Sequence, residues 1–491
     1  MHLTTAQLDR AAGVLLGTAA GDALGVPYEF ESRVLRGDEA PQMLGGGLGD
    51  FAPGEWSDDT SMAMAIADVA ATGADLTTDE ALDAIADNFL RWFDGGPADI
   101  GIQTRAVLSA ARRRLSRGGV GAGAIMRDEA NAYAEQHPHS AGNGALMRTA
   151  PVALAHLDDR DGLADAARLV AGLTHADALA GDSCVLWCEA IRVAVLDSRF
   201  DVRAGLDLLP DERVDQWSAW LGAAESRPPK SFSPNGFTVT ALQAAAAAIT
   251  QTPIPDAMPC RHLRSALDTA IRVGNDTDTV AAIAGGLLGA RWGASAVPWF
   301  WRRAIHGWPE RDGRPSDSHD LVALATLAVR VGEADDKGWP LVDDVPYSEH
   351  AFTDAVPHPF DDGVLLGTHA TVDHSADAVV SMCRVGRRQA CFGKATEFVE
   401  SRLIDSGDPV ENPNLEFVLA DTADAVRGMR AEGKTVLLHC VAGHQRTPSV
   451  AVEYGVMLGH SVEKVRAAVL EAMPGARGGG VVWAAAGEPR P

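Results

Sequence analysis

The chain has 491 residues, of which 46% are hydrophobic, and its 67 acidic residues outnumber its 42 basic ones to give a formal net charge of −25. A chain of this length exceeds one ordinary core and predicts about two to four domains. The negative charge argues against nucleic acid or an anionic membrane as a partner, because both attract positively charged surfaces. A surface that only keeps the protein dissolved is the simpler explanation of that charge.

Cysteine usage and hydropathy point to a reducing, aqueous compartment. The six cysteines include no Cys-x-x-Cys pair, so no disulfide framework is indicated. The first residues show no basic segment followed by an apolar one, as a secretory signal would. The longest apolar stretch, near residues 280–290, is shorter than the roughly 20 residues that a membrane-spanning helix needs. We therefore expect a cytoplasmic protein that does not associate with a membrane.

Residues 1–332 are predicted to form an all-α domain. Apolar residues recur at three- and four-residue spacing in stretches that Gly, Asp and Pro separate, at residues 8–24, 60–71, 80–93, 240–250 and 279–293. No alternating strand pattern and no repeat of fixed period is visible in this region.

Two short acidic clusters, SDDT at 57–60 and GNDTDT at 274–279, each begin one of these helices. Helix capping explains part of the pattern, because Ser and Asp are favoured at N-caps and acidic side chains suit the first turn. One cap needs only one acceptor, however, and neighbouring carboxylates repel. A bound cation would relieve that repulsion in both clusters. If the fold brings the clusters together, they predict a site for two Mg²⁺ or Mn²⁺ ions, since both prefer oxygen ligands.

Further polar residues stand at the ends of apolar helices. Asp22 and Glu29 flank a glycine-rich break, and Asp99 lies just before a helix. Asn143 lies between two glycines, which allow the backbone to approach a ligand closely, and His175 begins another helix. Each of these residues is individually explained as a cap, a turn or a structural histidine.

Taken in order, the segments GDALG…E, SDDT, DIG.QT, GNGALMR, TH…A and GNDTDT resemble the ADP-ribosylglycohydrolase family over nearly all of residues 8–330. The resemblance implies an all-α bundle that holds two Mg²⁺ or Mn²⁺ ions and hydrolyses an ADP-ribosylated protein or a small ADP-ribose conjugate. This chain has Ser57 where many relatives have Thr, which keeps the hydroxyl ligand.

Carried over by position, the resemblance assigns roles to individual residues. It places Glu29 beside the metals, and it implies that Asp99 acts on the ribose, although which of the two is the general base stays open. It assigns Asn143, Gly144 and His175 to ADP-ribose binding. The metal ligands that it implies are Ser57, Asp58, Asp59, Asp276, Asp278 and Thr279. The linkage that is cleaved is not encoded in these motifs.

The composition and the hydrophobic periodicity of the chain change after residue 332. Residues 333–350 are acidic, contain two prolines and lack helical periodicity, so they are predicted to form a linker. In residues 351–475, short β-like runs alternate with helical stretches, a pattern that predicts an α/β domain with a mostly parallel sheet. Residues 476–491, rich in Gly and ending in EPRP, are predicted to be a flexible tail.

Residues 435–447, TVLLHCVAGHQRT, place a cysteine between a strand and a helix. A loop of this length can turn its backbone amides inward to bind an anion, and Gly443 suits the turn. Arg446 adds a guanidinium fork that matches phosphate, and the amides favour a nucleophilic Cys440 thiolate. Thr447 can donate a hydrogen bond to that sulfur. The alternative is a buried apolar cysteine followed by an ordinary helix-start arginine.

This segment resembles the dual-specificity branch of the cysteine phosphatases, which implies an α/β fold, a phosphocysteine intermediate and a phosphorylated substrate. The resemblance also implies a general-acid Asp some thirty residues earlier, where both Asp405 and Asp408 qualify. Gln445 stands where typical members have a serine, which argues against phosphoprotein substrates. The sequence thus predicts a bifunctional hydrolase. The alternatives are a non-catalytic reader of ADP-ribose or phosphate and a phosphatase with a degenerate glycohydrolase domain.

Overall fold

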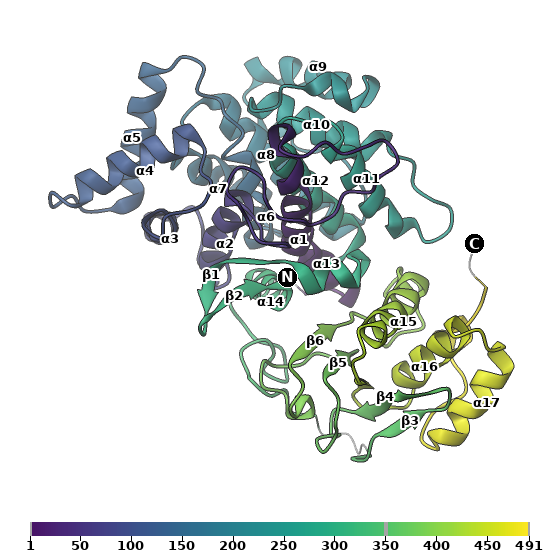
Figure 1. Cartoon of the computed structure of the whole chain (residues 1–491). Coiled ribbons are helices and arrows are strands. Elements are labelled where there is room, and N and C mark those ends of the chain that lie inside the picture. The colour runs from purple at the N-terminus through teal and green to yellow at the C-terminus, as the bar shows by residue number, and fades with distance from the viewer. Residues whose placement is uncertain (1, 348–351, 490–491) are drawn as a thin grey trace.

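The computed structural model describes residues 2–347 and 352–489, so the last residues of the predicted linker, residue 351 and the end of the predicted tail lie outside the described residues. The first part of the chain is a bundle of helices (Figure 1). In chain order these are α1 (Thr5–Gly25), α2 (Asp58–Ala70), α3 (Asp79–Asp94), α4 (Ile102–Leu115), α5 (Ala122–Gln136), α6 (Ala150–Ala155), α7 (Arg160–Gly172), α8 (Ala178–Asp197), α9 (Asp211–Ser226), α10 (Thr238–Gln251), α11 (His262–Ile271), α12 (Thr277–Trp292), α13 (Trp299–Ala304) and α14 (Ser318–Val329).

Helices α1 and α12 run antiparallel with their backbones in direct contact. A Cβ at Gly17 would lie 2.2 Å from the carbonyl oxygen of Gly285, and one at Gly21 would lie 2.0 Å from that of Ala281. Any residue larger than glycine would push the two helices apart at these positions. Glycines at every fourth position of α1 make this contact possible, and it brings the end of α1 beside the start of α12. These glycines are Gly13, Gly17, Gly21 and Gly25.

The first part is not entirely helical, which corrects the all-α prediction. Strands β1 (His306–Arg311) and β2 (Arg314–Asp317) form an antiparallel hairpin between α13 and α14. Its turn residues Asp312 and Gly313 both have positive φ, as an Asp-Gly hairpin turn requires. The strands carry polar residues and two prolines, so they lack the alternation on which the sequence prediction depends.

The second part is an α/β unit, as the alternation of β-like runs and helices predicted. Its sheet has the strand order β3-β4-β7-β5-β6, in which β3 and β4 are antiparallel and the other neighbours are parallel. A separate apolar core lies between the sheet and its helices. Its elements are β3 (Val356–His358), β4 (Asp361–Thr368), β5 (Ala378–Ser381), β6 (Glu397–Glu400), α15 (Leu415–Ala431), β7 (Val436–Cys440), α16 (Arg446–Met457), α17 (Val462–Ala472) and α18 (Val481–Ala485).

The segments predicted to be a linker and a loose tail are packed where the structure describes them. Trp339 and Val345 are buried against the helical core, and the Trp339 indole donates to the carbonyl oxygen of Val385 at 3.2 Å. Near the C-terminus, α18 buries Trp483 against the α/β core. Glycine-rich composition suggested mobility there, but one large aromatic side chain supplies enough apolar area to fix the segment.

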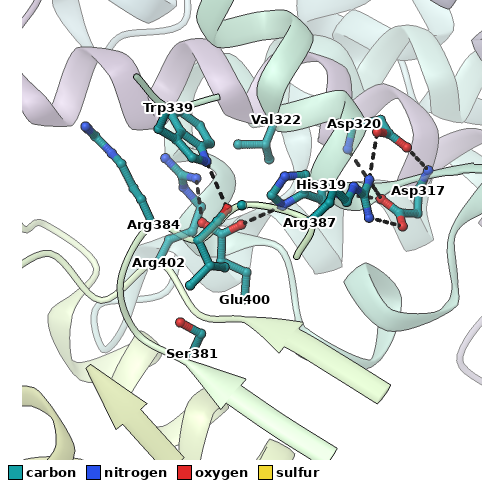
Figure 2. Close-up of polar contacts among 12 residues, drawn as sticks. Asp317, His319, Asp320, Val322, Trp339, Ser381, Arg384, Arg387, Glu400 and Arg402 are labelled. Atoms are coloured by element: carbon teal, nitrogen blue, oxygen red, sulfur yellow. Dashed lines mark hydrogen bonds and ion pairs between the residues drawn. The ribbon is translucent and has the colours of Figure 1, made fainter. Parts of the chain in front are cut away.

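Ion pairs join the two parts, and one of them is buried. Arg302 and Asp421, each less than 10% exposed, are 2.7 Å apart. Arg387 of the α/β part lies 2.6 Å from Asp317 and 2.7 Å from Asp320, at the start of α14 (Figure 2). Breaking a buried pair by removing one partner costs about 3–5 kcal/mol, because the remaining charge is left without compensation. The contacts therefore hold the two parts in one arrangement. Within the described residues, no helix has the length and apolar character to cross a bilayer.

Candidate active sites

Acidic side chains from three helix ends meet at one place in the helical part. Asp22 lies near the end of α1, Asp59 lies in the first turn of α2, and Asp276 comes directly before α12. Carboxylates form two groups with ligand atoms within 4.8 Å of one another, one of Asp22, Asp59 and Asp278 and the other of Glu29, Asp276 and Asp278. The two acidic clusters of the sequence thus meet in a double site that shares Asp278.

Several of these carboxylates lack partners. One oxygen each of Glu29, Asp59 and Asp278 is buried without a hydrogen-bond partner among the described residues. Burial, together with the charges of neighbouring carboxylates, raises the pKa of Glu29 to about 9. The same causes hold the pKa of Asp59 and of Asp278 well above the usual range. A divalent cation would supply both the missing positive charge and the missing partner.

Two hydroxyls and two further carboxylates border this double site. Ser57 Oγ donates to Asp59 Oδ2 at 3.0 Å, and Thr279 Oγ1 donates to the same oxygen at 3.3 Å. Burial, and then the charge of nearby Asp99, raise the pKa of Asp58 to about 7. Asp58 and Asp99 are both only partly buried, so they face the more accessible side of the cluster.

The sequence pattern did not assign Asp22 to the metal site. Its Oδ1 accepts from the Ser57 amide at 2.9 Å, and its Oδ2 accepts from the Thr60 amide at 2.9 Å and the Thr60 hydroxyl at 2.6 Å. These three bonds fix the start of α2, so Asp22 positions Ser57 and the residues that follow it. The only sequence signal for it was its place in the GDALG segment, beside a glycine-rich break.

Asn143 lies against the second acidic cluster. Its Nδ2 donates to Asp276 Oδ2 at 2.6 Å. A second asparagine, Asn235, accepts from the Asp276 amide at 3.1 Å and is fully buried. Asn235 carries no functional signal in the sequence, because its Pro-Asn-Gly context is typical of an ordinary turn. Together the two amides orient the carboxylate and the backbone of Asp276.

His175 supports the loop that carries Asn143. A Cβ at Gly144 would lie 2.9 Å from His175 Cε1, so glycine is needed there. His175 Nδ1 is 2.8 Å from Thr174 Oγ1, which accepts from Arg148 at 2.7 Å. Burial, and then the charge of Arg148, lower the pKa of His175 to about 3, so the ring is neutral. The fully buried Arg148 is a structural residue of this site that sequence analysis did not single out.

The donor set fits hard divalent cations. Carboxylate and hydroxyl oxygens are the ligands that Mg²⁺ and Mn²⁺ prefer, and a shared carboxylate is suited to a pair of ions. The unpartnered oxygens of Glu29, Asp59 and Asp278 offer unused acceptor positions at this place.

Comparison with known proteins agrees with this arrangement. A family model described as ADP-ribosylglycohydrolase matches residues 3–335. The chain belongs to the ADP-ribosylglycohydrolase family. An ADP-ribosylarginine hydrolase, Tri1, of Pseudomonas putida is 28% identical and aligns with 60% of this chain and 73% of its own length.

Two other proteins cover the same part of the chain. An ADP-ribosyl-dinitrogen reductase glycohydrolase of Rhodospirillum rubrum is 28% identical over 65% of this chain and 97% of its own length. A solved structure described as an ADP-ribosylglycohydrolase-related protein complex is 27% identical and covers 67% of this chain and 99% of that chain, with a TM-score of 0.47.

The second candidate site lies beyond the glycohydrolase domain, at the carboxyl end of β7. Cys440 is 3% exposed at the end of that strand, and α16 begins at Arg446. Among the described residues, none of the backbone amides from Val441 to Arg446 donates a hydrogen bond. Gly443 has φ +69°, and a Cβ on it would lie 2.6 Å from the Phe352 ring. The loop therefore offers free amides beside a buried thiol, which is what an anion requires.

The two candidate general acids differ in position. Asp405 Oδ2 lies 3.3 Å from Arg446 Nε, whereas the Asp408 carboxylate accepts from the Val410 amide at 2.8 Å and begins a turn. Arg446 Nη1 donates to the carbonyl oxygen of Met382, and its Nε is buried without a hydrogen-bond partner among the described residues. Asp405 is the carboxylate that the structure places beside the loop.

The predicted hydrogen bond from Thr447 to the departing Cys440 sulfur stays a prediction. The Thr447 hydroxyl donates to the carbonyl oxygen of Gly367 at a long 3.4 Å. Such a weak bond leaves the hydroxyl free to turn to another acceptor.

Proposed function

We propose that the glycohydrolase domain removes ADP-ribose from a modified side chain or small conjugate with the help of two divalent cations. The observation that carries this proposal is the pair of carboxylate groups that share Asp278 and contain three unpartnered oxygens. The residues that would hold the ions are Ser57, Asp58, Asp59, Asp276, Asp278 and Thr279. Asn143, Gly144 and His175 would border the bound ADP-ribose.

The chemistry proposed is hydrolysis at the ribose C1″. When bound, divalent cations neutralise the carboxylates and help to orient the ribose hydroxyls. A water oxygen forms the new bond to C1″. The bond from C1″ to the leaving nitrogen or oxygen breaks, and its electron pair stays on that atom, which takes up the proton that the water gives up. Asp99 or Glu29 takes the proton of the attacking water, and both carboxylates stabilise the cationic character of the ring in the transition state. Asp276, held by its two asparagine contacts, keeps its orientation through this step.

The test is release of ADP-ribose from arginine-linked and serine-linked peptides in the presence of Mg²⁺ or Mn²⁺. The arginine linkage comes first, because the Pseudomonas relative is named an ADP-ribosylarginine hydrolase. We expect Asp276→Ala to lose at least about 10²-fold in rate, the scale of losing an oriented electrostatic contact. Undiminished release by that variant would contradict the metal site. Tight binding of ADP-ribose with no release from any linkage would instead indicate a reader.

We propose a second activity for the α/β domain, namely cysteine-dependent hydrolysis of a phosphate ester. The free amides around Cys440 and the pairing of Arg446 with Asp405 support it. The thiolate forms a bond to phosphorus while the bond from phosphorus to the ester oxygen breaks, and Asp405 donates the proton that this oxygen takes. Water then attacks phosphorus, the bond to sulfur breaks, and Asp405 recovers a proton from the water. Arg446 stabilises the phosphoryl oxygens throughout.

Release of inorganic phosphate from para-nitrophenyl phosphate by the full chain tests this second activity. Asp405→Asn should slow the reaction, while Asp408→Asn provides the matched control and should remain within about twofold of the wild type. A slower Asp408→Asn with an unaffected Asp405→Asn would reverse the assignment of the general acid.

A further inference from the structure

The glycohydrolase domain lies next to the cysteine loop, residues 440–446, and covers one side of it. In a parallel sheet, ligands bind beyond the carboxyl ends of the strands. At that edge, the segments after β5 and β6, the start of α1 and Arg446 at the end of the loop line a partly open cavity of about 170 Å³. Its lining includes Leu8, Asp9, Cys383, Arg384, Asp405 and Arg446.

The cavity lies close to the proposed nucleophile. Cys383 lines it, and burial raises the pKa of this thiol to about 12, opposed by the charge of Arg446 and reinforced by that of Cys440. A phosphate held by the loop amides and Arg446 would direct the rest of its molecule into this cavity.

The wall formed by α1 is fixed to the segment that carries Asp405. Arg402 donates to Asp9 at 2.9 Å, and both side chains are largely buried. Two residues earlier, Glu400 lies 3.4 Å from His319 of α14, and Figure 2 shows these two side chains pointing toward each other across the junction. These contacts lie on either side of residue 401, so the segment leading to Asp405 is held against the glycohydrolase domain.

Charge pairing limits what this cavity accepts. Asp9 is neutralised by Arg402, and Arg384 pairs with Asp335 at 2.5 Å and lies over the Trp339 ring. Arg446 differs, because its partner Asp405 is 49% exposed and can turn away. Among the arginines that line the cavity, Arg446 is thus the one whose carboxylate partner is most exposed.

Its size limits the ligand further. Pockets for drug-sized ligands measure about 300–1,000 Å³. A cavity of about 170 Å³ has room for the equivalent of roughly six water molecules. The part of a ligand that lies inside this cavity is therefore of about sugar size.

We propose that the cysteine site takes the phosphate monoester of a compact, uncharged organic group of sugar size, and that the glycohydrolase domain supplies one wall of this site. The inference rests on the phosphatase activity proposed above and specifies its substrate class. The wall that α1 provides should favour such a group over a phosphoprotein or a phosphorylated dinucleotide.

The experiment compares phosphate release by the full chain from a hexose phosphate, para-nitrophenyl phosphate and a tyrosine-phosphorylated peptide. We expect kcat/KM for the hexose phosphate to exceed that for the peptide at least tenfold. Equal or faster turnover of the peptide would overturn the proposed substrate class while leaving the phosphatase activity intact. If no ester releases phosphate and the Cys440→Ser variant behaves like the wild type, the phosphatase proposal itself fails.

Variants of the α1 wall test the composite site directly. Leu8→Trp, and separately Thr5→Trp at an exposed position of the same wall, should raise KM for the hexose phosphate at least fivefold. Inhibition by inorganic phosphate should be unchanged, because the loop amides are untouched. Unaltered ADP-ribose release by each variant shows that the domain is folded. KM values within twofold of the wild type in both variants would show that α1 is not part of the site.

Discussion

The two candidate sites have opposite charge: one is rich in carboxylates and the other in hydrogen-bond donors and an arginine. The site in the helical bundle collects buried carboxylates with unpartnered oxygens, so it lacks positive charge. The site in the α/β domain collects Arg446 and backbone amides that have no acceptor among the described residues, so it attracts an anion. The first is assembled from three helix ends far apart in the chain, and the second from one continuous loop. The charge of the residues in each site thus indicates the charge of its ligand: a cation for the helical site and an anion for the loop. This holds even though the residues of the first site are far apart in the sequence.

The largest effects should come from removing the central residue of each site. Cys440→Ser should abolish phosphate release, and Asp278→Asn should reduce ADP-ribose release by about 10³-fold or more, because Asp278 is shared by both carboxylate groups. Each variant should leave the activity of the other domain within about twofold of the wild type. Parallel assays of both activities on both variants measure this.

Loss of both activities in either single variant would contradict the separation of the sites. Circular dichroism spectra that match the wild type would show that such a loss is not caused by unfolding.

A smaller effect is expected from Arg446→Lys. Lysine keeps the positive charge but loses the planar fork that binds two phosphoryl oxygens at once. We expect kcat for phosphate release to fall about 10²-fold, since one oriented donor is lost from the transition state. Steady-state kinetics with para-nitrophenyl phosphate measure the change, and a variant as active as the wild type would show that the guanidinium geometry is not used.

Metal removal should reveal the repulsion among the carboxylates. Ions at about 100 times their Kd stabilise a protein by about 2.7 kcal/mol, which corresponds to roughly 5–10 °C in Tm for a domain of this size. We therefore expect EDTA to lower the Tm of the glycohydrolase domain by about that amount and added Mg²⁺ or Mn²⁺ to restore it. In the Asp278→Asn variant, the difference in Tm between EDTA and added metal ions should be smaller. The Tm of this variant in EDTA should exceed that of the wild type in EDTA, because one buried carboxylate has been removed. Differential scanning calorimetry distinguishes these cases.

The smallest effect is expected at the contact that aligns the helices of the metal site. Gly17→Ala places a methyl group 2.2 Å from the Gly285 carbonyl oxygen, so the two helices must shift. Overpacking of this kind costs about 1–3 kcal/mol. The matched control is Gly37→Ala, where no atom lies within 4 Å of the added Cβ. Equal Tm values for the two variants would show that α1 can move away from α12 at no cost.

Sequence patterns revealed the parts of both sites that are continuous in the chain. The helices that begin at Asp58 and Arg446, and the strand that ends at Cys440, follow from local periodicity and capping. That the two acidic clusters meet could be stated only as a condition, because it depends on the packing of α1 against α12.

Other residues gave no local signal. Asn235 lies in a turn motif that many surface loops share, and the Arg402–Asp9 pair joins residues almost 400 positions apart. The burial of Trp483 in the predicted tail depends on a surface that only the folded α/β domain provides. Such features are tertiary, so neither composition nor spacing could predict them.

Helix α1 contributes to both candidate sites. It begins at the wall of the cysteine-site cavity and ends beside the carboxylates, and its 21 residues span about 30 Å. A molecule released at one end must therefore diffuse through solvent before it reaches the other. Expressing the α/β domain alone should raise KM at the cysteine site, because the isolated domain would lack one wall. On the proposal made above, fusion of the domains would complete the shape of the cysteine site rather than pass an intermediate between the two sites.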